Sequence, residues 1–339
     1  MQQLKESADR RELQPLPDDI STIQPGGGWG CRLELGWGRL RRWYLKRFRK
    51  SYLQRIKALC RSPADCQKSG QDHTSAGDIA HEILDPRDLK YIRNQTDCHW
   101  LEEDDPFYWR EKIPFARWGL VELQVVGYPL LALTVGLSLT GWELLAVGPA
   151  ILFALVVYFF RDPPRRIPQD TGSWVSPADG KISEVTDLAH DDFIGGPAVR
   201  IGIFLSIFNV HINRAPTRSR VIALRYQPGK FLNALDPASA IQNECMWMAL
   251  EEESAPHRPY VVRQIVGAIA KRIVCDTKPG EVLEKGHKFG MIKFGSRTEL
   301  IVPKTSELVV EAKEGQIIKA GTTVLCRYRP TGNLALERP

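Results

Sequence analysis

The sequence lacks the cysteine and histidine spacings that usually hold metal ions. Its seven cysteines include no CxxC pair and have no histidine at a metal-ligand spacing, so we predict no metal site. An odd, scattered set is more typical of reduced thiols in a cytosol-facing protein than of a disulfide framework. The first twenty residues are polar and include acidic side chains, so we expect no secretory signal there.

Acidic residues are missing from the segment 39–61, which is rich in Lys and Arg although the whole chain has a net charge of only +6. Apolar and aromatic residues recur in it at helical spacing, namely Leu40, Tyr44, Phe48, Tyr52, Ile56 and Leu59. We predict a basic amphipathic helix over 39–61 that lies on an anionic membrane surface. A nucleic-acid patch and an ordinary solvated helix are the competing interpretations. We favour the membrane and predict no nucleic-acid partner.

Two apolar runs, 125–139 and 144–160, are separated by a short polar break. Each falls short of the ~20 apolar residues of a comfortable transmembrane helix. The break predicts an antiparallel helical hairpin, either spanning or re-entrant. Arg117 precedes the first run and Arg165 follows the second, which predicts a cell-membrane protein with both hairpin ends, and the part of the chain that follows, on the cytoplasmic side. A buried pair of core helices is disfavoured because almost no polar face remains.

From Trp174 onward, short β-prone runs alternate with turns, which predicts a β-rich domain of the α+β class. The runs are 199–204, 221–226, 260–266, 273–275, 291–294, 299–302 and 307–311. The segment 237–253 is the one longer helical candidate, and the tail 309–324 is similar to half of a barrel-sandwich hybrid. We therefore predict three parts: a partly disordered N-terminal extension (1–118, with 1–30 disordered), a membrane hairpin (119–160) and a catalytic domain (161–339).

The pair Gly295–Ser296 lies between two of the β-prone runs. A serine hydroxyl there is within reach of the preceding carbonyl, which suits an acyl shift to an ester followed by β-elimination, although most Gly-Ser pairs are simply turns. A serine nucleophile needs a base, and the base needs an orienting carboxylate. His211 and Asp179 are of those types, although each is more often structural. The order Asp, His, Ser also occurs in subtilisin-type proteases, but the residues around Ser296 do not match theirs.

Four segments in order, 174–181, 204–216, 226–234 and 289–298, resemble the phosphatidylserine decarboxylase family, whose members cut themselves before a serine. The resemblance covers about 159–328. Phe208 stands where longer members have a second histidine, and Phe294-Gly295-Ser296-Arg297 replaces their Leu-Gly-Ser-Thr. Both features are similar to the shorter prokaryotic type, and they leave the identity of the proton donor open.

The resemblance implies a self-cleavage triad of Asp179, His211 and Ser296. Cleavage between Gly295 and Ser296 would give chains 1–295 and 296–339, and Ser296 would become the covalent pyruvoyl cofactor. The implied reaction turns phosphatidylserine into phosphatidylethanolamine and CO2, with a Schiff base between the pyruvoyl ketone and the substrate amine. His211 is the candidate proton donor.

Candidate contacts to the substrate headgroup are Arg214, Lys230 and Arg297. The alternatives are a decarboxylase of a related lipid such as archaetidylserine, and a non-catalytic, membrane-tethered, carrier-like module. The expected partners are the phospholipid, the membrane and the two cleaved chains, and the oligomeric state stays open. Because self-cleavage is intramolecular, we also expect it to proceed without the hairpin.

Overall fold

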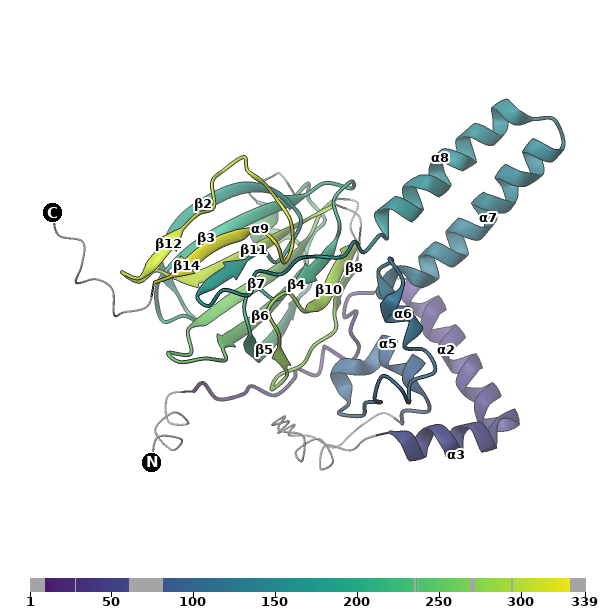
Figure 1. Cartoon of the computed structure of the whole chain (residues 1–339), viewed down its shortest axis with the longest axis horizontal. Helices are drawn as coiled ribbons and strands as arrows, with labels where there is room; N and C mark the ends of the chain where they lie inside the picture. The colour runs from purple at the N-terminus through teal and green to yellow at the C-terminus, as the bar shows by residue number, and fades with distance from the viewer. Residues whose placement is uncertain are drawn as a thin grey trace.

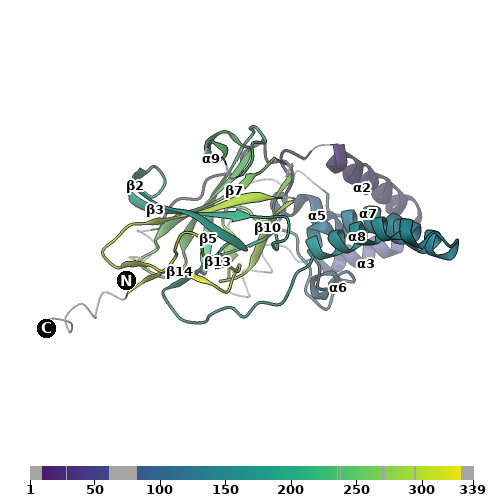
Figure 2. The ribbon, with the colours of Figure 1, turned by 90° about the horizontal axis from the view of Figure 1, so that it is seen from above.

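The computed structural model describes residues 10–27, 29–60, 82–234, 236, 238–268, 272–293 and 295–329. Figure 1 shows a β-rich body, a long helical hairpin directed away from it, and the helices of the N-terminal extension beside the base of the hairpin. Figure 2 shows from above that these helices and the hairpin lie at the same end of the β-rich body.

One antiparallel sheet of eight strands forms most of the β-rich body. In spatial order its strands are β13 (Ile317–Ile318), β2 (Gly180–Asp191), β3 (Gly196–Leu205), β11 (Ser296–Pro303), β7 (Pro259–Val266), β6 (Cys245–Glu252), β5 (Ser219–Gln227) and β9 (Val282–Leu283). Strand β11 therefore lies inside the sheet, paired with β3 on one side and β7 on the other.

Two sheets of three strands complete the body. One has the order β1 (Ser173–Val175), β14 (Val324–Tyr328), β12 (Leu308–Val310), and the other has the order β4 (Ile212–Arg214), β10 (Lys288–Lys293), β8 (Arg272–Cys275). Trp174 is fully buried in the main core, with ring centroids 4.6 Å from Tyr260 and 5.3 Å from Tyr328. Aromatic contacts thus join strands of different sheets into one core.

The prediction that the chain is β-rich from Trp174 onward is confirmed. Each of the seven predicted β runs overlaps an observed strand; Phe294, at the end of one run, is outside the described residues. The helix predicted over 237–253 is wrong, because only a single turn, α9 (Ser239–Gln242), forms before strand β6. The apolar run inside this segment, 245–250, is short enough to suit a buried strand as well as a helix. The backbone of β6 forms ladders with β5 on one side and β7 on the other.

The predicted helical hairpin is present as α7 (Leu120–Leu139) and α8 (Glu143–Phe159). Among the described residues, one helical stretch, Arg117–Leu139, is long and apolar enough to cross a membrane, with a mean hydropathy of 1.7 and 6% of that window buried. Helix α8 is apolar but shorter. Leu139 at the end of α7 and Leu144 at the start of α8 are more than four-fifths exposed, and other large apolar side chains on both helices are also exposed. Within the part of the chain that the structure describes, no protein layer covers the hairpin over most of its length.

The prediction of disorder over 1–30 is wrong for residues 10–27. Ile20 and Ile23 are buried in the core. The Gln14 amide donates to the Ile222 carbonyl at 3.0 Å, and the Cys275 amide donates to the Ile23 carbonyl at 2.8 Å. A few apolar residues are enough to order this polar segment, because they pack against the core of the β-rich body. Residues 1–9 and 28 are outside the described part.

The predicted helix 39–61 is two helices, α2 (Trp29–Phe48) and α3 (Lys50–Leu59), separated at Arg49 by non-helical backbone angles. Residue 61 lies outside the described part. The remaining helical turns of the extension are η1 (Pro86–Asp88), α5 (Leu89–Ile92), η2 (Arg93–Gln95), α6 (Trp109–Lys112) and η3 (Arg117–Gly119). The buried carboxylate of Asp88 pairs with Arg41 and Arg42 and so fixes α2 to this layer.

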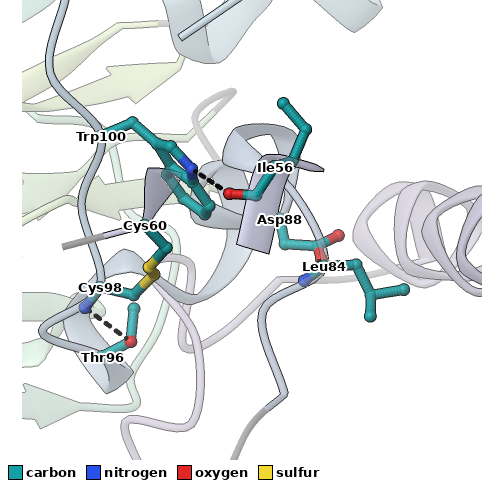
Figure 3. Close-up of a disulfide and its surroundings, with 7 residues drawn as sticks. All are labelled: Ile56, Cys60, Leu84, Asp88, Thr96, Cys98 and Trp100. Carbon is teal, nitrogen blue, oxygen red and sulfur yellow. Dashed lines mark hydrogen bonds between the residues drawn. A yellow bond between two sulfur atoms is a disulfide. The ribbon is translucent and has the colours of Figure 1, made fainter. Parts of the chain in front are cut away.

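A disulfide joins Cys60 at the end of α3 to Cys98, with a Cα–Cα distance of 6.2 Å. Figure 3 shows it beside Trp100, whose indole N–H donates to the Ile56 carbonyl at 3.1 Å. The expectation of reduced thiols is therefore wrong for these two cysteines. They are 38 residues apart, so only the folding of the extension brings them together. The cysteines free in the described part are Cys31, Cys245, Cys275 and Cys326, all buried.

We expect Trp174→Ala to lower the free energy of unfolding by about 3–5 kcal/mol, because it leaves a large cavity between strands of two sheets. Trp109→Ala is the matched control, since that ring is 52% exposed and should change stability by only about 0.5 kcal/mol. Urea unfolding of both variants measures the difference. Equal stabilities would contradict the central place of Trp174 in the core.

Candidate functional site

The bond between Gly295 and Ser296 lies where the chain leaves the small sheet of β10 and enters the large sheet of β11. Gly295 has φ +67°, in the left-handed region that side chains disfavour. A Cβ added there would meet no atom closer than Ile207 Cγ2 at 3.9 Å. The backbone conformation, and not a lack of space, therefore requires glycine at this position.

Ser296 is the first residue of β11 and pairs with Leu205 on β3 and Val266 on β7. It is fully buried. Its Oγ has no hydrogen-bond partner within the part of the chain that the structure describes. Leaving a buried hydroxyl without a partner costs about 1–3 kcal/mol, so this serine does not serve stability. Such an atom is typical of a group kept for chemistry.

His211 precedes strand β4, which pairs with β10. This pairing places its carbonyl 3.2 Å from the Ile292 amide, three residues before Gly295. The ring Nε2 accepts the Gly295 amide hydrogen at 3.1 Å, and Nδ1 lies 2.9 Å from the Asn209 carbonyl. Because a carbonyl only accepts, Nδ1 carries the proton, and the lone pair of Nε2 is the one that accepts from the Gly295 amide. The ring is therefore a neutral base beside the Gly295–Ser296 bond.

The surroundings of His211 keep it neutral. Burial, together with the smaller effect of the Arg161 charge, lowers the pKa of His211 to about 4, against the opposing effect of the hydrogen bond to Asn209. Since this pKa lies below the ordinary value of about 6.5, the ring is unprotonated at neutral pH. It is thus in the form that accepts a proton from a hydroxyl.

The structure does not pair Asp179 with His211. Asp179 lies in the turn between β1 and β2, where Oδ2 accepts from Arg165 at 2.8 Å and Oδ1 accepts from the Ala320 amide at 2.8 Å. The proton on His211 Nδ1 goes to the Asn209 carbonyl instead. The orienting group in this arrangement is therefore a backbone carbonyl two residues away, which inspection of side-chain types overlooked.

Gly267 is a second residue that sequence reasoning missed. A Cβ on it would lie 2.6 Å from the Gly295 carbonyl oxygen and 3.4 Å from the Ala234 Cβ. No side chain fits there, so the backbone at Gly267 covers the carbonyl that the serine would attack. The only sequence signal was a glycine directly after a β-prone run.

The three candidate headgroup contacts lie in different environments. Arg214 is mostly buried and pairs with Asp162 at 2.9 Å. Arg297 is buried and its guanidinium donates to Glu184 at 2.6 Å and Glu299 at 2.9 Å. Both are held in ion pairs, which suits a structural role. Lys230 is exposed, and its Nζ donates to the neutral Gln242 side chain at 3.0 Å.

In the described part of the chain, no group of three or more His, Cys, Asp or Glu side chains is placed to hold a metal ion. The expected cofactor needs no separate binding site, because it would be made from Ser296. The left-handed Gly295, the buried Ser296 hydroxyl without a partner and the neutral His211 fit that origin.

Comparison with known proteins identifies the family. The family model for phosphatidylserine decarboxylase matches residues 152–326. A phosphatidylserine decarboxylase proenzyme of Rhodopirellula baltica is 48% identical over 241 residues, which cover 71% of this chain and 99% of the relative. Proenzymes of the same name from Chlorobium chlorochromatii and Carboxydothermus hydrogenoformans are 45% and 44% identical, over 54% and 53% of this chain and 84% and 82% of the relatives. The chain belongs to the phosphatidylserine decarboxylase family.

Proposed function

We propose that this protein is a phosphatidylserine decarboxylase that makes a pyruvoyl group from Ser296 by cutting itself after Gly295. The observation that carries the proposal is the contact of the neutral His211 Nε2 with the Gly295 amide, next to the buried Ser296 hydroxyl that has no partner in the described residues. Relatives over most of the chain are named proenzymes of this activity. The product of the reaction would be phosphatidylethanolamine with release of CO2.

Self-cleavage uses only groups of this chain and water. His211 Nε2 leaves the Gly295 amide and takes the proton of Ser296 Oγ, which attacks the Gly295 carbonyl carbon, so that a C–O bond forms and the peptide C–N bond breaks. The proton then passes from His211 to the released nitrogen. His211, neutral again, takes the Ser296 α-proton, and the Cβ–O bond breaks to free the Gly295 carboxylate. Water replaces nitrogen in the remaining dehydroalanine, releasing ammonia and leaving a pyruvoyl group.

The pyruvoyl group, once made, supplies a carbonyl electron sink for the carbanion left by CO2. The chain's own residues hold it in place. Strand β11 keeps residue 296 between Leu205 and Val266, in a buried position from which water is largely excluded. His211 stays beside it on a separate chain segment, so the same ring that accepts a proton in self-cleavage is placed to return one to the product.

The two chains stay together because the cut lies between strands of different sheets. The chain 296–339 begins with β11, which pairs with β3 and β7 of the larger chain. Of its other strands, β13 pairs with β2 and β14 pairs with β1, both in the larger chain, and β12 pairs with β14. Fourteen ladder pairs join β11 to its neighbours, eight with β3 and six with β7. No covalent link is needed to hold residue 296 in the core.

We also propose that the hairpin anchors the enzyme in the cell membrane. Helix α7 has 20 residues and so a length of about 30 Å, comparable to the hydrocarbon thickness of a bilayer. Arg117, Arg161 and Arg165 flank the hairpin ends, which favours a catalytic domain on the cytoplasmic side. The Cys60–Cys98 disulfide weighs against that side, but the charges adjoin the hairpin directly and decide the proposal.

Helix α2 offers a second contact with the membrane surface. Trp37, Trp43 and Phe48 are 67%, 59% and 58% exposed, and Figures 1 and 2 show α2 beside the base of the hairpin. Exposed aromatic side chains next to Lys and Arg are typical of helices at an anionic lipid surface. Loss of the hairpin would leave this weaker, charge-dependent contact.

We expect Ser296→Ala to leave a single full-length chain without decarboxylase activity, because no hydroxyl attacks Gly295. Intact mass spectrometry measures both cleavage and the pyruvoyl mass. Ser254→Ala, a substitution in an exposed loop, should cleave like the parent. Two chains from Ser296→Ala would show that the bond is cut by another route.

We expect His211→Ala to slow self-cleavage by about 10²–10⁴-fold, the usual contribution of a general base. Asp179→Asn should slow it much less, because the amide oxygen still accepts from Ala320 and the carboxylate does not touch His211. Conversion of precursor followed on denaturing gels compares the two. An equal and severe defect in both would restore a direct role for Asp179.

Replacing residues 126–155 by a short Gly-Ser linker should release the protein from membranes at high salt. Burial of the apolar hairpin in the bilayer does not depend on salt, whereas salt screens the attraction between the basic side chains of α2 and an anionic lipid surface. Flotation on liposomes containing phosphatidylserine, at low and high salt, tests this. Salt-resistant flotation of the shortened protein would mean that another segment anchors it.

A further inference from the structure

Both ends of the hairpin contact groups that flank the Gly295–Ser296 bond. Phe159, the last residue of α8, packs on His211, and Glu122, in the first turn of α7, pairs with Lys293. The first contact is with the proposed base, His211, and the second is with the last residue of β10, which precedes the Gly295–Ser296 bond. Neither was expected from the sequence, where the hairpin served attachment alone.

The contact at the end of α8 is an aromatic one. The ring centroids of Phe159 and His211 are 4.5 Å apart, with the planes tilted by 36°. Phe159 is 5% exposed and also packs edge-on against Phe160 at 4.9 Å. The imidazole is thus held by Phe159 on a ring face and by Asn209 and Gly295 at its two nitrogens.

The contact at the start of α7 is a buried ion pair. Lys293 is 1% exposed; its Nζ pairs with Glu122 and donates to the Trp118 carbonyl at 3.0 Å. Glu122 also pairs with Arg272 on β8 at 2.7 Å. Lys293 is the last residue of β10, two residues before Gly295. The first turn of α7 therefore fixes the end of the strand from which the scissile bond projects.

We propose that the base of the hairpin positions the self-cleaving bond: Phe159 holds the His211 ring, and Glu122, through Lys293, holds the end of β10 next to Gly295. The proposal rests on the proposed self-cleavage. It makes Phe159 and Glu122 positioning residues, since neither touches Ser296. It also makes the docked hairpin a condition for maturation, whereas the apolar outer part of the hairpin serves the membrane.

The physical reason is the narrow geometry of an intramolecular attack. Displacement of reacting groups by about 1 Å costs on the order of a hundredfold in rate. His211 lies on a loop before a three-residue strand, so its ring depends on neighbouring side chains for its orientation. These contacts argue against the expectation that self-cleavage proceeds without the hairpin: a deletion that includes Phe159 removes the ring packing, while one limited to 126–155 preserves it.

The test compares self-cleavage rates of full-length variants made by cell-free synthesis with liposomes. We expect Phe159→Ala and Glu122→Gln to slow cleavage by about ten- to a hundredfold. The matched controls are Phe153→Ala, which removes a ring from the same helix six residues earlier, and Glu143→Gln, the same change at the exposed hairpin tip. Both controls and the linker variant lacking 126–155 should cleave at the parent rate.

Two further measurements separate positioning from mere stability. Phe159→Tyr keeps the ring and should restore the rate. The pH profile should also change, because the base works only when neutral and burial keeps the pKa of His211 at about 4. Opening the Phe159 face raises that pKa toward its ordinary value, so the acid limb of the profile moves to higher pH. Arg161, whose charge also lowers the pKa of His211, is unchanged in these variants. Glu122→Gln should lower the rate without moving the limb.

The inference is overturned if the parent protein cleaves and Phe159→Ala matches Phe153→Ala in both rate and pH profile. Because Glu122→Gln leaves the apolar packing intact, it tests the proposal even where Phe159→Ala does not fold. Glu122→Gln cleaving as fast as Glu143→Gln would also count against it. A parent protein that stays a single chain would instead overturn the proposed function itself.

Discussion

The site depends on the hydrogen bond from the Gly295 amide to His211 Nε2. It joins the two segments that meet in the proposed self-cleavage: the loop before β4 and the crossing from β10 to β11. The antiparallel pairing of β4 with β10 brings these segments together, and the left-handed angle of Gly295 lets the chain enter the second sheet at once. The pairing of β4 with β10 fixes the His211 side of this hydrogen bond, and the pairing of β11 with β3 and β7 fixes the segment that follows Gly295.

Burial gives the site its chemical character. A histidine inside the protein without a carboxylate partner is destabilised in its charged form, which leaves it neutral and available as a base. The same burial leaves the Ser296 hydroxyl away from water. A serine protease obtains a base by adding a carboxylate behind the histidine; here the Asn209 carbonyl fixes the tautomer, and Asp179 is engaged with Arg165.

The hairpin and the N-terminal extension both make ion pairs with residues close to the Gly295–Ser296 bond. Glu122 links α7 to Lys293 of β10 and Arg272 of β8, and Arg272 also pairs with Glu34 of α2 at 3.3 Å. A charge cluster of this kind needs every member, since removing one leaves a buried charge without compensation. The extension, the hairpin and the end of β10 therefore meet at one set of charges beside the Gly295–Ser296 bond.

The sequence by itself determined the features that local patterns encode. Short β-prone runs separated by turns predicted seven strands, two apolar runs around a polar break predicted the hairpin, and the resemblance of ordered motifs singled out Gly295, Ser296 and His211. Only the tertiary structure decided which groups meet. Strand β6 replaced a predicted helix because β5 and β7 pair with it, and Cys60 met Cys98 because the extension folds back. His211 contacts the Asn209 carbonyl and the Phe159 ring, whereas Asp179 pairs with Arg165. Such contacts depend on strand register and on packing between distant segments, which short-range periodicity does not contain.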